Sequence, residues 1–161
     1  MCGRYAVKKS TLLVANSLVK KNINVDLDSD NFNCSPGGKY PVIKSATNGK
    51  YLEMTIWGLK PSWAKEDFRP LHNARLEGID TKVSFKKLII NSRAIVPCSG
   101  YYEWKKTDNK KIPYYFTKVD DQDIFLAGIH DNGQFCVITR NAEPNNSEVH
   151  HRQPVIVPKS Q

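Results

Sequence analysis

The sequence has no hydrophobic stretch near the roughly 18 apolar residues that a bilayer-spanning helix needs. Its first residues also lack the apolar region of a secretory signal. These two absences exclude a helical membrane protein and predict a cytoplasmic location, nucleoid-associated if the source is bacterial. No repeat, low-complexity tract or linker divides the 161 residues, so we expect a single domain.

The cysteine pattern lacks the features of a metal or redox site. Cys2, Cys34, Cys98 and Cys136 form no C-x-x-C pair, and no histidine lies at zinc-ligand spacing from a cysteine pair. We therefore expect no metal and no cofactor. In a reducing compartment the four side chains are free thiols, and Cys34, Cys98 and Cys136 are predicted to be buried packing residues.

Acidic residues are in short supply, because 16 Asp and Glu residues stand against 24 Lys and Arg residues and leave a net charge of +8. A surplus of this size favours a polyanionic partner such as a nucleic acid. The basic residues are spread along the chain, mostly as adjacent lysines that could simply be solvated surface groups. Charge by itself therefore does not distinguish DNA from RNA.

The first part of the chain carries one helical pattern and little other regular structure. Apolar residues recur at helical spacing over residues 10–21. Residues 22–50 are rich in Asn, Asp, Gly and Pro and predict loop, with one short strand around residues 40–44. A strand is predicted over residues 51–59 and a short helix over residues 81–90.

From residue 94 onward, β-branched and aromatic runs alternate with turn sequences. The predicted strands cover residues 94–104, 114–119, 124–129, 135–139 and 155–157. Asn132 and Gly133, between two apolar runs, predict a tight hairpin. Together these elements predict an α+β fold, a single domain of mostly antiparallel strands in a curved or barrel-like sheet with a few short helices.

Cys2 has a special chemical position, because methionine aminopeptidases remove Met1 before small residues and would leave Cys2 at the N-terminus. Its α-amine, with a pKa of about 7.7–8.0, and its thiol, with a pKa of about 8.5, would then both react near neutral pH. An aldehyde can condense with the amine to an imine, which the thiol closes to a five-membered thiazolidine. No other cysteine has a free α-amine, so Cys2 alone is a candidate for this reaction.

Three further clusters combine polar groups that could assist such a reaction: residues 72–77 (HNARLE), 99–104 (SGYYEW) and 149–154 (VHHRQP). Glu103 lies among aromatic residues, where desolvation raises the pKa of a carboxyl and suits it to general acid catalysis. Each cluster could instead be an ordinary polar surface, with Arg75 and Glu77 joined in a salt bridge. The clusters alone leave these alternatives open.

Together with the N-terminus, these clusters resemble one protein family. Five motifs occur in the family's order and approximate spacing: residues 1–6 (MCGRYA), 57–64 (WGLKPSWA), 73–77 (NARLE), 100–105 (GYYEWK) and 150–154 (HHRQP). The chain is similar to the SRAP family (SOS response-associated peptidase), whose members shield abasic sites in single-stranded DNA. The likeness runs from residue 2 to about residue 158 and implies antiparallel strands around a positively charged groove.

The resemblance also implies a chemistry, in which Cys2 captures the aldehyde of a ring-opened abasic deoxyribose as a thiazolidine. By motif, Asn73 would form a hydrogen bond near the sugar. Glu103 would be the acid/base that opens the sugar ring and moves protons during imine formation. His150 would assist protonation and stabilise the sugar hydroxyl, whereas His151 is expected to be a bystander.

DNA contacts follow from the same resemblance. Arg4 and Arg75 would clamp phosphates beside the lesion, as bidentate guanidinium groups do. Trp63 and Pro36 resemble the family's apolar residues that wedge against or stack on flanking bases, although the match around Pro36 is looser. The two remaining tryptophans are expected in the hydrophobic core: Trp57 and Trp104.

The chain departs from the family pattern at three places. Ser99 stands where the family usually has Asp, and Gln153 stands where it commonly has Met. The sequence ends at Gln161, whereas typical members continue with a Trp-Leu pair and a helix. We therefore expect a SRAP domain that is short at its C-terminus, with stability and the grip on one DNA flank affected.

Three functions remain in competition. The leading hypothesis is a monomer that binds single-stranded DNA and captures abasic sites covalently. The second is a thiol autopeptidase that cleaves a leader ahead of Cys2, with Cys2, His150 and Glu103 as its reactive set; Met1 alone precedes Cys2, which weakens this hypothesis. The third is a basic module that binds single strands without covalent chemistry.

Overall fold

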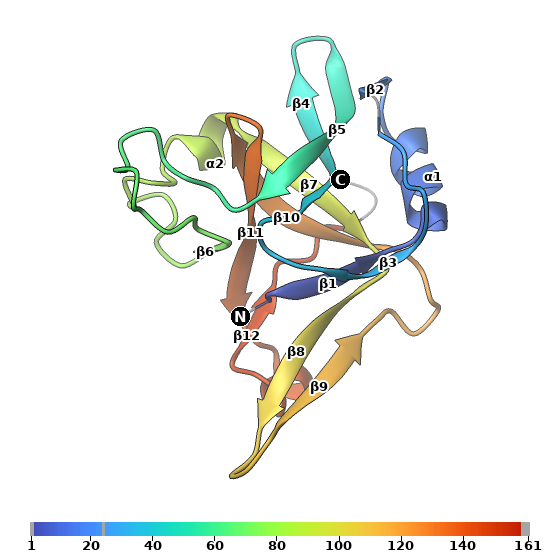
Figure 1. Cartoon of the computed structure of the whole chain (residues 1–161), viewed down its shortest axis with the longest axis vertical. Helices are drawn as coiled ribbons and strands as arrows, with labels where there is room; N and C mark the ends of the chain where they lie inside the picture. Colours follow the sequence, from blue (N-terminus) through green and yellow to red (C-terminus); the bar gives the residue numbers. More distant parts are fainter. Residues whose placement is uncertain (1, 24, 159–161) are drawn as a thin grey trace.

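The computed structural model describes residues 2–23 and 25–158, and Figure 1 shows their arrangement. Strands dominate in these ranges, and the three helices found there are short. The strands are β1 (Arg4–Val7), β2 (Lys21–Ile23), β3 (Asn31–Cys34), β4 (Lys39–Ala46), β5 (Gly49–Trp57), β6 (Asn73–Arg75), β7 (Arg93–Cys98), β8 (Gly100–Lys106), β9 (Lys111–Phe116), β10 (Ile124–Asp131), β11 (Gln134–Asn141) and β12 (Arg152–Pro154). The helices are α1 (Lys9–Ser17), α2 (Leu88–Asn91) and α3 (Pro144–Ser147). None of the helices in this part of the chain is long and apolar enough to cross a membrane.

Two sheets of mainly antiparallel strands build the fold. The smaller has the order β3-β1-β8-β9, and the larger runs β12-β11-β10-β7-β4-β5-β2, with β6 beside β11. The larger sheet curls until β5 meets β11 in a short parallel pairing, Gln134 opposite Ile56 and Phe135 opposite Trp57. The sheet is therefore ring-like without being a closed barrel. The predicted fold class of mostly antiparallel strands with few short helices is confirmed.

The chain passes from the larger sheet to the smaller one at Ser99, between β7 and β8. The Ser99 N–H donates a hydrogen bond to the Ala6 carbonyl oxygen at 2.8 Å, which starts the pairing of β8 with β1. The next residue is a glycine, Gly100, because the ring of Tyr115 from β9 lies against its backbone and leaves no space for a side chain. A Cβ at this position would be 2.4 Å from Tyr115 Cζ, closer than any side chain permits. This change of sheet brings β8 beside the N-terminus.

Several expected elements are present with shifted bounds. The predicted helix at 10–21 is α1, which ends at Ser17, and the chain then forms β2. The hairpin between β10 and β11 turns at Asn132 and Gly133, whose φ angles of 45° and 73° suit the mirror-image turns of tight hairpins. The predicted strand at 94–104 is two strands, β7 and β8, because Ser99 moves the chain between sheets.

The predicted helix at 81–90 is wrong over most of its length. The segment folds as successive turns, and α2 begins only at Leu88. Ile79 and Phe85 from these turns are buried in a core cluster with Leu59 and Ile138. Burial of these irregularly spaced apolar side chains decides the local conformation in place of helical propensity.

Trp57 lies at the centre of the main core, as predicted. It is fully buried, with its ring centroid 5.1 Å from that of Tyr5 and 6.1 Å from that of Phe135. Its indole Nε1–H donates to the His72 carbonyl oxygen at 2.9 Å, and the Val137 N–H donates to the same oxygen at 3.0 Å. The core residue Trp57 therefore helps to fix the backbone immediately before β6.

We predict that Trp57→Phe lowers the free energy of unfolding by about 1–3 kcal/mol, because the change leaves unfilled volume and removes one buried hydrogen bond. Trp63→Phe is the matched control, because Trp63 is 56% exposed and its replacement should change stability by less than about 0.5 kcal/mol. Urea unfolding of both variants checks this. Equal midpoints for the two variants would contradict the central role of Trp57.

Candidate functional site

Pairing of β1 with β8 brings Cys2 close to Glu103. The last registered pair at this end is Arg4 opposite Tyr102; Glu103 is the next residue of β8, and Cys2 lies two residues before β1 begins. Cys2 is fully buried. Burial, and next the nearby carboxyl of Glu103, raise the pKa of the Cys2 thiol to about 12. The sulfur is therefore a neutral thiol at pH 7, and it becomes a nucleophile only when a base takes its proton.

Asn73 on β6 forms a hydrogen bond with Cys2. Parallel pairing places Asn73 opposite Val137 of β11, and its Nδ2 donates to the Cys2 carbonyl oxygen at 3.0 Å. Its Oδ1 is buried and has no hydrogen-bond partner among the described residues. A buried acceptor without a partner is costly, so this oxygen is suited to accept a hydrogen bond from a bound molecule.

Glu103 and His150 face each other, with Glu103 Oε2 4.0 Å from His150 Nδ1. Burial raises the pKa of Glu103, which is 2% exposed. Burial also lowers the pKa of His150, and the positive charges of Lys106 and Arg152 add to this effect. Both groups are therefore held toward their neutral forms near pH 7.

The backbone of Arg152 holds the ring of His150. The Arg152 N–H lies 3.0 Å from His150 Nδ1, and the Arg152 carbonyl oxygen lies 3.2 Å from the same nitrogen. Nδ1 therefore meets a backbone donor and a backbone acceptor, and it can form a hydrogen bond in either tautomer. These contacts fix the orientation of the ring beside Glu103.

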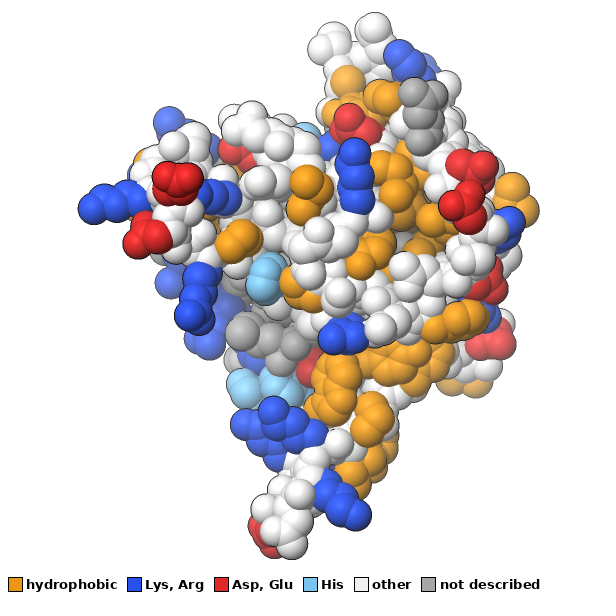
Figure 2. Space-filling model, viewed as in Figure 1, with side chains coloured by type: hydrophobic (Ala, Val, Ile, Leu, Met, Phe, Trp, Pro, Cys, Tyr) orange, Lys and Arg blue, Asp and Glu red, His pale blue; other side chains and the backbone are white. Residues whose placement is uncertain are grey.

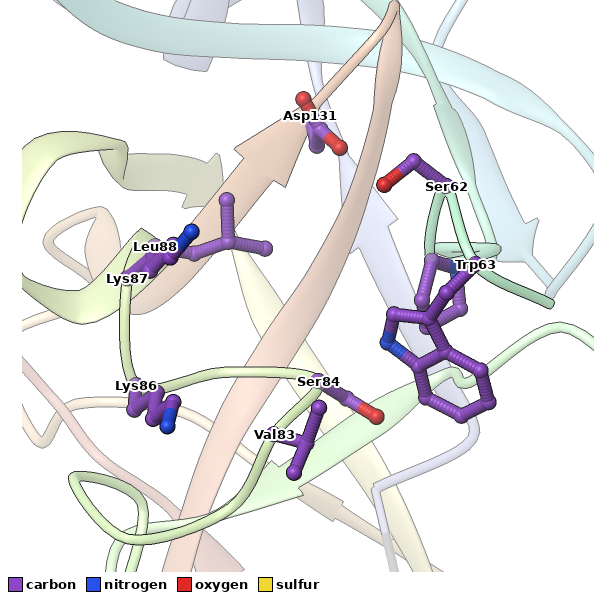
Figure 3. A pocket seen from close by; sticks show the side chains of 9 residues that line it. Ser62, Trp63, Val83, Ser84, Lys86, Lys87, Leu88 and Asp131 are labelled. Atoms are coloured by element: carbon purple, nitrogen blue, oxygen red, sulfur yellow. The ribbon is translucent and has the colours of Figure 1, made fainter.

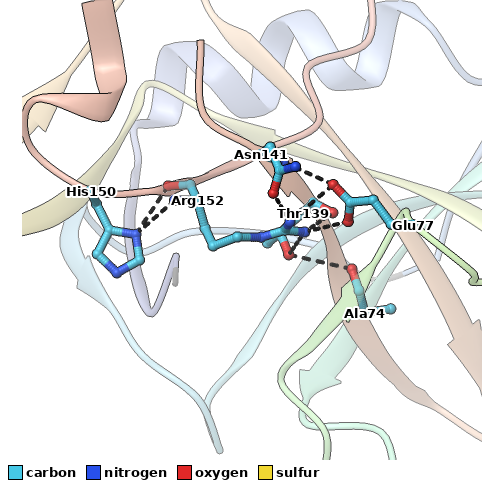
Figure 4. Close-up of polar contacts among 6 residues, drawn as sticks. All are labelled: Ala74, Glu77, Thr139, Asn141, His150 and Arg152. Atoms are coloured by element: carbon cyan, nitrogen blue, oxygen red, sulfur yellow. Dashed lines mark hydrogen bonds and ion pairs between the residues drawn. The ribbon is translucent and has the colours of Figure 1, made fainter. Parts of the chain in front are cut away.

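Arg152 joins the segments that carry these residues, and Figure 4 shows its contacts. Its guanidinium, 5% exposed, binds both carboxylate oxygens of Glu77 at 2.9 and 2.8 Å. The same group donates to Asn141 Oδ1 at 2.7 Å and to the Thr139 carbonyl oxygen at 2.8 Å. A bidentate pair with this many supporting acceptors holds β12 and the preceding His150 in place.

Glu77 therefore pairs with Arg152, and the alternative salt bridge between Arg75 and Glu77 is wrong. The backbone explains the difference, because Arg75 is an exposed residue of β6 while Glu77 lies beyond the strand and also accepts the Asn141 N–H at 2.9 Å. The hydrogen bonds from Arg152 lower the pKa of Glu77 to about 2. This pair links two of the sequence motifs, residues 73–77 and 150–154.

The predicted DNA contacts are distributed around this centre. Arg4 lies two residues after Cys2, and its Nη1 donates a hydrogen bond to Asn33 Oδ1 on β3. Arg75 is exposed near His151, whose pKa its charge helps to lower. Pro36 is half-buried in the turn between β3 and β4.

Trp63 lines a hollow of about 430 Å³ that shares no residue with the surroundings of Glu103. Its ring packs edge-on against Phe68, with centroids 5.6 Å apart. Figure 3 shows the indole facing Val83 and Ser84 across the hollow, and Lys86 also lines it. An exposed ring beside lysine is an arrangement that fits a nucleobase with its phosphate.

Trp104 is not in the core, contrary to the prediction. It is half-exposed and lines a hollow of about 340 Å³ together with Glu103, Lys106, Lys111 and His150. Side chains alternate between the two faces of a β-strand, and this pattern is the signal that sequence reasoning missed. If Glu103 points inward, the next residue, Trp104, points to the other face. The sequence predicted both side chains to be buried.

The remaining cysteines agree with the sequence. Cys34, Cys98 and Cys136 are buried free thiols. Burial raises the pKa of Cys136 to about 12, as expected for an unreactive packing residue. Met1, whose removal the N-terminal chemistry requires, lies outside the described residues.

We predict that Glu77→Gln destabilises the protein at pH 7 by about 1–3 kcal/mol, because it leaves the buried Arg152 guanidinium without its counter-charge. The folded pKa of Glu77 lies below its ordinary value of 4.5, so the stabilisation is present above that pH and is lost as the pH falls toward 2. Urea unfolding from pH 7 to pH 2 should show a smaller pH dependence for the variant. Asp28→Asn, at an exposed position, is the control, and identical curves for Glu77→Gln and wild type would contradict the anchoring role.

Known proteins resemble this chain over nearly all its length. The abasic site processing protein YedK of Escherichia coli K12 is 32% identical over 98% of this chain and 75% of its own. The abasic site processing protein YoqW of Bacillus subtilis is 29% identical over 98% of this chain and 76% of its own. A crystal structure of a protein from Bacteroides thetaiotaomicron superposes with a TM-score of 0.82 at 26% identity, covering 99% of this chain and 78% of that one.

A second crystal structure, of a phage-related protein from Bordetella bronchiseptica, superposes with a TM-score of 0.77 at 28% identity and covers 98% of this chain and 78% of its own. Residues 1–161 match the family described as SOS response associated peptidase (SRAP). A family match over the full sequence, together with the shared fold, identifies the chain as a member of the SRAP family.

Proposed function

We propose that this protein processes abasic sites in single-stranded DNA by forming a covalent thiazolidine through Cys2 after removal of Met1. The observation that carries the proposal is the convergence of Cys2, Asn73, Glu103 and His150 from four distant segments of the chain. Relatives that are named abasic site processing proteins support an abasic site as the substrate, and the net charge of +8 supports DNA as the partner.

The reaction balances without an oxidant or a cofactor. The free α-amine of Cys2 adds to the aldehyde carbon of the ring-opened sugar, and loss of one water gives an imine. The Cys2 sulfur then adds to the same carbon, its proton passes to the imine nitrogen, and the thiazolidine ring closes. Because the thiol pKa is raised to about 12, a base must remove the proton as the sulfur adds.

Each neighbouring residue has a defined task in this scheme. Glu103, whose pKa is raised by burial, donates a proton to open the sugar ring and as a carboxylate accepts one from the thiol. His150 donates a ring N–H to a sugar oxygen. Asn73 holds the Cys2 carbonyl through Nδ2 and offers its buried Oδ1 to a sugar hydroxyl.

The DNA strand on either side of the lesion is held by the surrounding residues. Arg4 and Arg75 bind phosphates, and Trp63 and Pro36 pack on flanking bases. These contacts do not depend on base identity, which suits a protein that must find a missing base in any sequence context. We also propose that the protein acts as a monomer in one SRAP domain.

The peptidase alternative has weaker support from the geometry. A cysteine peptidase needs a thiolate, and the raised pKa of Cys2 opposes its formation. His150 Nδ1 is already engaged by the backbone N–H and carbonyl oxygen of Arg152, so this nitrogen is poorly placed to take a proton from the thiol. A protein that bound single strands only non-covalently would have no use for a buried carboxyl such as that of Glu103.

We predict that processed protein beginning at Cys2 forms a denaturation-resistant cross-link to single-stranded DNA with one abasic site, and that Cys2→Ala forms none. Cys136→Ala should cross-link normally, because that buried thiol lies in the other core cluster. Protein carrying one extra residue ahead of Cys2 should also fail, since its α-amine is displaced. Denaturing gels and mass spectrometry measure each outcome, and a missing band for protein confirmed to begin at Cys2 would overturn the proposal.

We predict that Glu103→Gln slows cross-linking by about 10²–10⁴-fold, the usual contribution of a general acid–base, while reversible DNA binding persists. The wild-type rate should fall as the pH rises through the raised Glu103 pKa, and the variant should lose that dependence. Single-turnover rates from pH 5 to pH 9 test both effects. Loss of binding together with the rate would show instead that Glu103 is structural.

A further inference from the structure

Beyond Tyr102, none of the described residues of β1 pairs with β8, and this edge lies next to the proposed reactive groups. Its pairing with β1 ends at Arg4 opposite Tyr102, while its pairing with β9 continues to Lys106 opposite Lys111. The two strands form an arm that projects from the rest of the molecule (Figure 1). The hollow of about 340 Å³ lies at this edge, and Glu103, Lys106 and Lys111 are among its lining residues.

Two lysines lie directly opposite each other on this arm. Lys106 and Lys111 are cross-strand partners, so their side chains emerge on the same face. Like charges in this position destabilise a sheet, and no carboxylate of the described residues is within salt-bridge distance of either. A bound anion between the two ammonium groups would remove this repulsion.

An aromatic row leads up to the lysine pair. The ring centroid of Tyr115 is 4.7 Å from that of Tyr102, and the ring of Tyr102 is 6.4 Å from that of Trp104. Trp104 and Lys106 are two residues apart on one strand and therefore share a face. Figure 2 shows hydrophobic side chains along the arm, with Lys or Arg side chains beside them. Aromatic rings followed by paired cations match a nucleotide, which has a planar base and an anionic phosphate.

A second hollow, of about 250 Å³, adjoins the first and shares Trp104, Lys106 and His150 with it. The second hollow has Lys105 and Lys106 among its lining residues, but it also has the carboxylate of Glu148, which would repel a phosphate. Among the described residues that line the first hollow, Glu103 alone has a carboxyl, and burial favours the neutral form of that group. The charges therefore direct a phosphate to the hollow that Lys106 and Lys111 share.

We propose that the arm is a DNA subsite for the nucleotide next to the abasic site on one flank, with its base on Trp104 and its phosphate between Lys106 and Lys111. This subsite rests on the proposed function, because it places the flanking nucleotide beside the sugar held at Glu103 and His150. It extends the DNA path to a part of the chain separate from the Trp63 hollow.

The test measures reversible binding to single strands that carry a tetrahydrofuran abasic analogue, which has no aldehyde and does not cross-link. The analogue is placed centrally, at the 5′ end or at the 3′ end. Trp104→Ala should weaken binding to the central analogue by about 5- to 150-fold, the range for losing one stacked base. The loss should disappear for one of the two end-placed analogues, which lacks the nucleotide that Trp104 holds. Trp104→Phe should retain most of the affinity.

The lysines are tested through salt dependence. Lys106→Gln and Lys111→Gln should each reduce the slope of log affinity against log salt by about one. Lys110→Gln is the matched control, because this exposed neighbour lines neither hollow and should leave the slope unchanged. An equal loss for all three lysines would show a diffuse charge effect and overturn the subsite.

Two further outcomes separate the subsite from the covalent chemistry. Flank-dependent loss in Trp104→Ala, combined with no cross-link from wild type on aldehyde-bearing DNA, would support the subsite and overturn the thiazolidine. Normal cross-linking, combined with unchanged affinity of Trp104→Ala or an equal loss on both end-placed analogues, would overturn the subsite alone. An absence of DNA binding by the wild type would overturn both.

Discussion

The guanidinium of Arg152 connects three parts of the chain that have no sequence proximity: the segment after β6, the end of β11 and the start of β12. Glu77 neutralises it, and five oxygens of Glu77, Asn141 and Thr139 accept its hydrogens, which offsets much of the cost of burying a cation there. Its backbone N–H then fixes the ring of His150. One buried ion pair thus positions the side chain that is proposed to act on the sugar.

The residues proposed to react owe their properties to burial. Cys2 and Glu103 are taken out of water where β8 passes beside β1, and burial raises the pKa of both. Such a site favours neutral species that exchange protons over permanently charged ones. This preference agrees with imine and thiazolidine formation, in which proton transfer accompanies each bond, and it disagrees with chemistry that begins from a stable thiolate.

Local signals predicted those parts of the fold in which neighbouring residues decide the conformation. The α1 pattern, the alternating apolar runs and the tight turn at Asn132 and Gly133 all correspond to observed elements. The strand β3 was missed because it is short and carries two asparagines, Asn31 and Asn33, and it forms by pairing with β1. The helix at 81–90 failed because two buried side chains, Ile79 and Phe85, override local propensity.

By itself the sequence determined the family motifs, the surplus of positive charge and the one cysteine that can present a free α-amine. It could not decide which partner Glu77 takes, or that Trp104 lies at the surface in a hollow shared with Lys106 and Lys111. Those outcomes depend on strand pairings between residues that are tens of positions apart, such as Asn73 with β11 and Arg4 with β8. Contacts at that range are selected by the packing of the whole chain, because side-chain environments exist only once the sheets have formed.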